Sequence, residues 1–246
     1  MDIQNKNYNQ NEFTSSTPID SEAKTRAFLS NVFTYMAGAL SITGLIAYLF
    51  GNNASLLSYL VNFETGGMTG LGWIVMIAPL AFVLIMNFAF ERLSSFTLLA
   101  LFVAYSVTMG LSLSFVFLIY TSGSIASTFF IAAATFGVMG VLGYTTKQDL
   151  TKFGAILMMA VVGLTIAMVV NFFIASTMLD LLISCVGVLV FTGLTAYKVQ
   201  MLKRIGSGAE YGSESTNKLA IIGALTLYIT FVNLFLMLLR LFGDRR

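Results

Sequence analysis

Seven long apolar stretches occupy most of the chain, and their length constrains the fold more than any other feature. A helix rises about 1.5 Å per residue, so about 20 residues cross a hydrocarbon core of about 30 Å. In lipid the backbone must form helices or a closed barrel, and these stretches are too long for barrel strands. We therefore predict an all-α membrane protein with seven transmembrane helices: Phe28–Phe50, Gly72–Phe90, Phe96–Tyr120, Ile125–Tyr144, Phe153–Ala175, Leu179–Tyr197 and Leu219–Phe242.

The composition supports an integral membrane protein whose first partner is the lipid bilayer. Of the 246 residues, 57% are hydrophobic and 10% are charged, whereas a soluble domain has about 25% charged residues. The net charge of +2 is too small to indicate nucleic-acid binding. Residues 1–27 are polar and are expected to form a disordered cytoplasmic tail. Residues 28–246 are expected to form one membrane domain.

The absence of histidine from the sequence limits the chemistry that the protein can perform. It excludes zinc sites that depend on His, and nucleophilic catalysis by Ser–His or Cys–His pairs. The one cysteine, Cys185, has no partner within the chain for a disulfide. We expect no enzymatic activity, no catalytic residues, no cofactor and no metal site. Any proton sensing would have to use carboxylates with shifted pKa values.

The distribution of Lys and Arg predicts the orientation, because positive residues favour the cytoplasmic side. They occur in the tail and after the second, fourth and sixth stretches, at Lys6, Lys24, Arg26, Arg92, Lys147, Lys152, Lys198, Lys203, Arg204 and Lys218. The segments after the first, third and fifth stretches contain none. A cytoplasmic amino terminus follows. Arg240, Arg245 and Arg246 would then lie outside, so the last stretch either crosses despite them or half-inserts and returns; we favour seven crossings.

The last stretch carries a stripe of polar and small residues on one helical face. The stripe consists of Gly223, Thr226, Thr230, Asn233 and Arg240, at three-, four- and seven-residue steps. A polar face in lipid turns toward other helices or toward a wet cavity. The Thr and Asn side chains could therefore join helices by hydrogen bonds or line a pathway. The stripe predicts an interior position for this helix.

Two shorter patterns concern local structure. Gly137, Gly140 and Gly143 recur every three residues in the fourth stretch, and small residues at such spacing favour close helix packing. Asp149 lies in a turn just before the fifth stretch, where its carboxylate can cap the first amides of a helix.

Several motifs, taken in order, resemble those of the Bax inhibitor-1 family, in particular its bacterial YccA-like branch. The matching segments are Phe28–Phe33, Ala78–Leu80, Gly110–Ser114, Gly143–Thr151, Phe191–Tyr197, Leu227–Tyr228 and Phe231–Phe235. The resemblance covers nearly everything after residue 27. It implies a seven-helix fold whose last helix is central and is wrapped by three antiparallel helix pairs. It also implies a pH-sensitive calcium leak in some members, and regulation of membrane proteases or cell-death machinery in others.

The chain departs from the calcium-leak members at two positions. In those members an Asp follows the Tyr that ends the sixth helix, and a second Asp in the seventh helix shares protons with it. Here the two positions hold Lys198 and Thr230. Calcium needs several oxygen ligands, usually including carboxylates, so an ammonium and a hydroxyl do not replace that pair.

The resemblance and the polar stripe together define the candidate pore and gating residues. They are Lys198, Thr230, Glu91, Arg92, Asn233, Thr195 and Thr226. Arg92 corresponds to an Arg that the family is thought to use as a latch, and Glu91 could pair with Lys198. Alternatively, Lys198 extends to the cytoplasmic headgroups, as cations at helix ends commonly do.

The predicted function is an ion leak channel for Ca²⁺ or H⁺ with an altered pH sensor, in the inner cell membrane. The alternative is a regulator that transports nothing and binds a membrane protease or another membrane partner.

Overall fold

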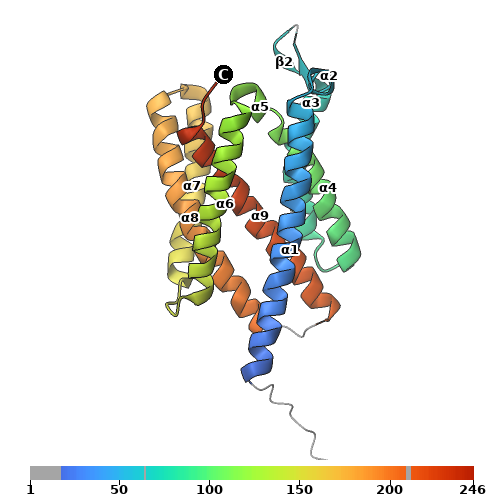
Figure 1. Cartoon of the computed structure of the whole chain (residues 1–246), viewed down its shortest axis with the longest axis vertical. Helices are drawn as coiled ribbons and strands as arrows, with labels where there is room; N and C mark the ends of the chain where they lie inside the picture. The colour runs from blue at the N-terminus through green and yellow to red at the C-terminus, as the bar shows by residue number, and fades with distance from the viewer. Residues whose placement is uncertain (1–17, 64, 209–211) are drawn as a thin grey trace, which may run out of the picture.

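A computed structural model describes residues 18–63, 65–208 and 212–246 of the chain (Figure 1). Residues 1–17, which make up most of the predicted disordered tail, lie outside the described residues. The long helices are α1 (Pro18–Gly51), α3 (Gly70–Phe88), α4 (Ser95–Leu113), α6 (Ser122–Thr145), α7 (Thr151–Ile174), α8 (Thr177–Gly208) and α9 (Glu214–Phe242). Within the described residues, seven helical spans are long and apolar enough to cross a membrane. The predicted all-α fold with seven spans is confirmed.

Four short elements complete the structure. The short helices are α2 (Ala54–Leu57) and α5 (Val116–Ile119), and α5 continues the span that α4 begins. Strands β1 (Val61–Asn62) and β2 (Gly67–Met68) pair antiparallel in the loop between α2 and α3. They lie at the end of the bundle opposite to the start of α1 (Figure 1).

Helix α1 begins ten residues before the predicted start of the first span at Phe28. Residues 18–27 are therefore helical, which corrects the expected tail over this part. The helix continues outward because Thr25, Phe28 and Val32, at three- and four-residue steps, are all buried against the bundle. Helix α8 likewise extends to Gly208, beyond the predicted Tyr197.

Helix α9 forms the centre of the bundle, as predicted. Of its most apolar eighteen-residue window, 72% is buried, against 11–33% for the corresponding windows of the other six spans. Helices α1, α4, α6 and α8 all contact it. In Figure 1 it runs obliquely, with α1, α3 and α4 on one side and α6, α7 and α8 on the other. The helices on both sides therefore share one buried helix.

The carboxyl terminus lies at the end of the bundle opposite to the start of α1 (Figure 1). Helix α9 runs without a break to Phe242, so the alternative of a half-inserted, returning segment is wrong. Beyond it, the Thr121 amide donates to the Asp244 carbonyl at 3.1 Å, which ties the terminus to the start of α6. The guanidinium groups of Arg240 and Arg245 lie 3.6 and 3.7 Å from the carboxylate of Asp180. That carboxylate partly offsets the positive charge at this end.

The three glycines that recur every three residues in α6 differ in how closely they approach a neighbouring helix. A Cβ atom at Gly143 would lie 2.2 Å from the carbonyl oxygen of Ala196 in α8. At Gly140 the nearest atom, of Val199, would be 3.9 Å away, and at Gly137 nothing lies within 4 Å. The predicted close packing therefore holds at Gly143, where α6 meets α8, and not at Gly137.

Substituting Gly143→Ala should destabilise the protein, because the new methyl group meets the backbone of α8 and forces the helices apart. We expect a loss of about 1–3 kcal/mol, as for other overpacked sites. Thermal unfolding in detergent micelles measures it. Gly137→Ala is the matched control and should be neutral or slightly stabilising, because Ala is the better helix former. Equal destabilisation by both changes would contradict this account of the α6–α8 contact.

Candidate functional site

The polar stripe of α9 faces α8 along most of its length. The two helices run antiparallel and approach closely at small residues on either helix. A Cβ at Gly223 would lie 2.7 Å from a methyl group of Leu202, and one at Gly187 would lie 2.8 Å from Met237. Further along, Arg240 meets Asp180 in the first turn of α8. The stripe is therefore a helix–helix interface.

Lys198 lies in this interface, one helical turn before Leu202. Its ammonium donates to the Thr230 hydroxyl at 2.8 Å and to the Thr226 carbonyl at 3.5 Å. The Thr230 hydroxyl in turn donates to the same carbonyl at 2.8 Å, so its oxygen can accept from Lys198. We call Lys198, Thr226 and Thr230 the Lys198 contact. Three of the predicted residues thus lie together, and the ammonium points toward α9 rather than toward the headgroups.

The Lys198 contact lies inside the bundle rather than at its end. Lys198 precedes Lys203 in α8, which at about 1.5 Å per residue places it about 7 Å further from the end of the helix. Lys198 is half-buried and Thr230 is buried. A cation at such depth must be paired with polar groups, and here these are the hydroxyl and carbonyl of one turn of α9.

Glu91 and Arg92 do not join the Lys198 contact. Both are exposed, in the turn that follows α3. Among the described residues, none of the ion pairs includes Glu91 or Lys198, so the predicted Glu91–Lys198 pair is absent. The reason is the packing of α3, which lies against α4. Lys198, by contrast, lies between α8 and α9.

Thr195 and Asn233 lie on the two helices of this interface but bond within their own helices. The Thr195 hydroxyl donates to the Phe191 carbonyl at 2.8 Å, and the Asn233 amide donates to the Ile229 carbonyl at 2.8 Å. Such bonds satisfy a polar side chain in an apolar setting without a second helix. Thr195 is buried and Asn233 is half-buried.

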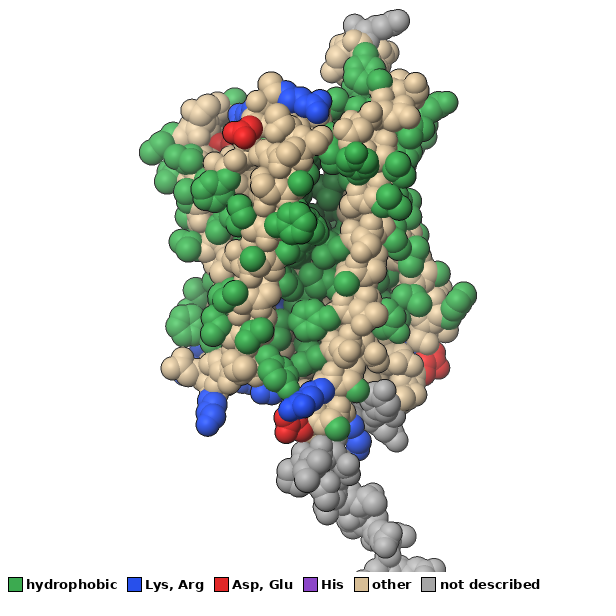
Figure 2. All heavy atoms as spheres, in the orientation of Figure 1, with side chains coloured by type: hydrophobic (Ala, Val, Ile, Leu, Met, Phe, Trp, Pro, Cys, Tyr) green, Lys and Arg blue, Asp and Glu red, His purple; other side chains and the backbone are tan. Residues whose placement is uncertain are grey.

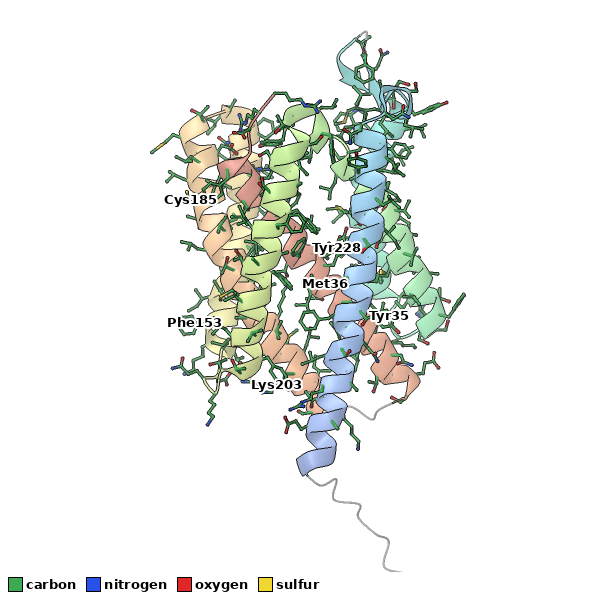
Figure 3. The ribbon with its side chains drawn as sticks, viewed as in Figure 1. Tyr35, Met36, Phe153, Cys185, Lys203 and Tyr228 are labelled. Atoms are coloured by element: carbon green, nitrogen blue, oxygen red, sulfur yellow. The ribbon has the colours of Figure 1, made fainter. Side chains whose placement is uncertain are left out.

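A second polar cluster, which the sequence analysis did not identify, joins three helices on another face of α9. The Tyr228 hydroxyl lies 2.7 Å from the Thr43 hydroxyl of α1, and Thr43 donates to the Ser106 carbonyl of α4 at 2.8 Å. Thr43 has one hydrogen to donate, so Tyr228 must be the donor between the two hydroxyls. The Tyr105 ring packs edge-on against Tyr228 at 5.2 Å. Tyr228 lies near the middle of the bundle (Figure 3).

The sequence feature that could have indicated this cluster is a tyrosine in the middle of a span. A buried tyrosine usually needs a partner for its hydroxyl, but the partner's identity depends on how α1 and α4 pack. Tyr228 lies between Thr226 and Thr230 in sequence and faces away from them. Helix α9 is therefore held by polar bonds on two sides.

A cavity of about 590 Å³ lies between α1 and α6. Its walls are mostly apolar, and Phe231, Val232 and Phe235 of α9 form part of its lining. Figure 2 shows the hollow between these helices, lined by hydrophobic side chains. Lys198 and Thr230 are not among its lining residues. The cavity offers little to a hydrated ion.

The end of the bundle that contains the start of α1 is built from polar and basic side chains. The Gln200 amide donates to the Gln148 carbonyl at 2.7 Å, and its oxygen accepts from the Leu150 amide at 2.9 Å. The Asp149 carboxylate accepts from the first amide of α7, at Thr151, as predicted, although the N-cap residue of the helix is Leu150. Arg204 donates to the same carboxylate at 2.7 Å.

The surroundings of Asp149 determine how it responds to pH. Hydrogen bonds from the hydroxyl and amide of Thr151, and then from Arg204, hold the pKa of this carboxyl well below its usual range. A depressed pKa means that the stabilisation is complete above the unfolded value of about 3.9 and is lost only in stronger acid. Asp149 therefore stays ionised at neutral and mildly acidic pH.

Metal-binding groups do not gather in the part of the chain that the structure describes. No three of its Cys, Asp and Glu side chains lie close enough together to hold a metal ion. The interior of the site is formed by one ammonium, hydroxyls and carbonyls. These groups can exchange or pass protons, whereas they offer no carboxylate to a divalent cation.

Comparison with known proteins places the chain among multi-pass membrane proteins. Residues 25–246 match the family model described as inhibitor of apoptosis-promoting Bax1. The inner membrane protein YbhL of Escherichia coli is 41% identical over 233 residues, which cover 94% of this chain and 97% of YbhL. The uncharacterized protein RP147 of Rickettsia prowazekii is 39% identical over 243 residues, covering 96% and 99%. An uncharacterized protein of Borreliella burgdorferi is 41% identical over 219 residues, covering 89% and 92%.

Removing either hydroxyl of the Tyr228–Thr43 bond should destabilise the protein, but unequally. Tyr228→Phe removes a donor and should cost about 1 kcal/mol. Thr43→Val leaves the buried Tyr228 hydroxyl unpaired and should cost more, about 1–3 kcal/mol. The free energies of unfolding in detergent measure both changes.

The matched control is Thr34→Val, on an exposed face of α1, where the hydroxyl bonds only to the Ser30 carbonyl of its own helix. It should change stability by less than about 0.5 kcal/mol. The double variant of Thr43 and Tyr228 should lose less than the sum of the single losses, because both remove one bond. Additive losses would show that the two hydroxyls act independently.

Proposed function

Because the chain belongs to the Bax inhibitor-1 family, we propose that it is a proton leak of the inner membrane that excludes Ca²⁺. It has no enzymatic activity, and its amino terminus lies in the cytoplasm. The observation that carries this proposal is the Lys198 contact, which places an ammonium and a hydroxyl within the membrane domain, 2.8 Å apart. The family resemblance supports a leak, and the name of the relative YbhL supports the inner membrane.

The charge of Lys198 supports the exclusion of Ca²⁺. A divalent cation about 5 Å from a fixed ammonium is repelled by several kcal/mol at the effective dielectric constant of about 20 used for protein sites. Thr226 and Thr230 offer one carbonyl and one hydroxyl, which are too few ligands to offset that repulsion. The replacement of the two carboxylates by Lys198 and Thr230 also alters the pH sensor, because no pair of carboxylates shares protons at these positions.

The same groups support H⁺ as the permeant ion. A lysine amine accepts and releases protons, and ionisable residues within membrane domains commonly mark proton pathways. The Thr230 hydroxyl, 2.8 Å away, accepts a hydrogen bond from the Lys198 ammonium and holds it in position, so that Lys198 itself takes up and releases the proton. Lys198 therefore acts as the relay and Thr230 as its neighbour on α9.

The alternative function, a regulator that transports nothing, is favoured by a different observation. Most of the stripe on α9 is engaged in contacts with α8 or in bonds within α9, and the cavity between α1 and α6 is mostly apolar. Such a protein would act by binding a membrane protease or another membrane protein. Removing residues 1–17, which precede the described part, should then abolish co-purification of that partner, and an unchanged partner set would count against this role.

The test of the leak is ion flux into liposomes that contain the purified protein, with dyes for H⁺ and Ca²⁺ and external pH between 6 and 8. The wild type should pass H⁺ and no more Ca²⁺ than empty liposomes. Lys198→Met should slow H⁺ entry by at least about tenfold, because a positioned proton-transfer group contributes roughly 10²–10⁴-fold. Lys152→Met, at the start of α7 and outside the Lys198 contact, is the control and should conduct like the wild type.

The double variant Lys198→Asp, Thr230→Asp should gain a Ca²⁺ flux that changes with pH between 6 and 8. Two adjacent carboxylates share a proton, and their coupling raises an apparent pKa toward neutral. Asp149 does not contribute to such a change, because its depressed pKa keeps it ionised throughout this range. Ca²⁺ entry through the wild type would overturn the exclusion. Absence of H⁺ flux in the wild type would reject the leak in favour of the regulator.

A further inference from the structure

A cleft of about 550 Å³ lies at the end of the bundle where α1, α6 and α8 meet. We call it the basic cleft. Its lining includes three basic side chains, those of Lys147, Lys203 and Arg204, and several hydroxyl side chains, among them those of Thr145, Thr146 and Ser207. Figure 3 labels Lys203 at this end, between α8 and the start of α1. Neither the Lys198 contact nor the predicted leak uses these residues.

The charges of the basic cleft leave it positive. Glu22 also lines it, but this carboxylate pairs with Arg26 at 2.6 Å, and Arg204 pairs with Asp149 at 2.7 Å. Lys147 and Lys203 take part in none of the ion pairs among the described residues. The Lys203 ammonium donates to the Tyr144 carbonyl at 2.7 Å, which fixes its position and leaves further hydrogens to donate.

An apolar groove of about 320 Å³ adjoins the basic cleft and runs between α1 and α6. We call it the α1–α6 groove. Tyr144 lines both the groove and the cleft, and Leu29, Phe33, Phe136 and Val141 provide apolar walls for the groove.

Gly137 and Gly140 also line the groove. A Cβ atom at Gly137 would meet nothing within 4 Å, so this glycine leaves space where a larger side chain would fill it. The repeat of glycines therefore leaves a groove at Gly137, whereas at Gly143 it allows α8 to approach closely.

We propose that the basic cleft binds the phosphate headgroup of an anionic phospholipid, with an acyl chain in the α1–α6 groove. The cations and hydroxyls match a phosphodiester, and basic pockets between transmembrane helices are typical sites for anionic headgroups. The groove selects a lipid over a free phosphate, because its apolar walls belong to two membrane-spanning helices. A zwitterionic lipid gains less, since its ammonium group opposes the charge of Lys147 and Lys203.

A single tryptophan in the groove would report which lipid occupies it. Trp73 is the only tryptophan of the chain, so Trp73→Phe combined with Phe33→Trp yields one reporter on the groove wall. The full chain is reconstituted in phosphatidylcholine with a fixed fraction of brominated phosphatidylglycerol, whose acyl bromines quench tryptophan on contact. We expect quenching well above that given by the same fraction of brominated phosphatidylcholine. Equal quenching by the two lipids would overturn the proposal.

Charge variants in this reporter background identify the headgroup site. Lys147→Gln should weaken the preference for phosphatidylglycerol about fivefold, the factor expected for one Lys near an anionic surface. Lys147 is exposed, so its loss leaves the packing intact. Lys203→Gln should act in the same direction. Lys152→Gln, at the start of α7 and outside the cleft lining, is the matched control and should keep the full preference. A fivefold loss in the control would mean that only the overall charge of this end attracts the lipid.

Two further experiments distinguish a bound lipid from other ligands. Gly137→Leu should lower quenching by brominated phosphatidylglycerol, because the new side chain fills the groove. Glycerol phosphate in millimolar excess should not displace the lipid, because it lacks an acyl chain. Displacement by glycerol phosphate, or full quenching in Gly137→Leu, would overturn the assignment of the groove to an acyl chain. Neither experiment depends on ion flux, so the proposal of a leak and the proposal of a lipid site can be rejected independently of each other.

Discussion

The structure depends on how the polar groups of α9 are satisfied inside an apolar bundle. This helix has the most buried span of the protein, and a polar side chain there needs a partner or carries a desolvation cost. Tyr228 meets Thr43 on the side of α1 and α4, and Thr230 meets Lys198 on the side of α8. Because the two contacts lie on different sides, they fix the rotation of α9 about its axis.

The same arrangement limits how the protein can move. The helices on the two sides of α9 are each bonded to it within the same two turns. A displacement of α8 relative to α9 would break the bonds of Lys198 and leave an ammonium in a poorly solvated place, whereas a displacement of α1 would break the Thr43–Tyr228 bond. Opening therefore requires a new partner for Lys198, such as water or another ion, and that requirement makes this residue the most informative one to change.

The sequence predicted the seven spans and the central helix because both follow from local rules. Apolar length defines a span, and periodic polar residues define its inward face. The sequence identified both Lys198 and Thr230, although it did not show that they are in contact. The suggested pairing of Glu91 with Lys198 is absent among the described residues, because α3 packs against α4. The Tyr228 cluster was missed because Thr43 looks like any other hydroxyl in α1. Which helices meet depends on tertiary packing, and the local patterns of a sequence do not reveal it.

The two ends of the bundle show why charge alone does not describe a membrane protein. Arg240 and Arg245 lie at one end, near the carboxylate of Asp180, which reduces their attraction for anionic lipid. At the other end Lys147 and Lys203 face a cleft that continues into an apolar groove. A count of positive residues treats both ends alike, whereas the pairing of each cation determines its role. Cations at the first end hold the terminus of α9, and cations at the second remain available to a ligand from the bilayer.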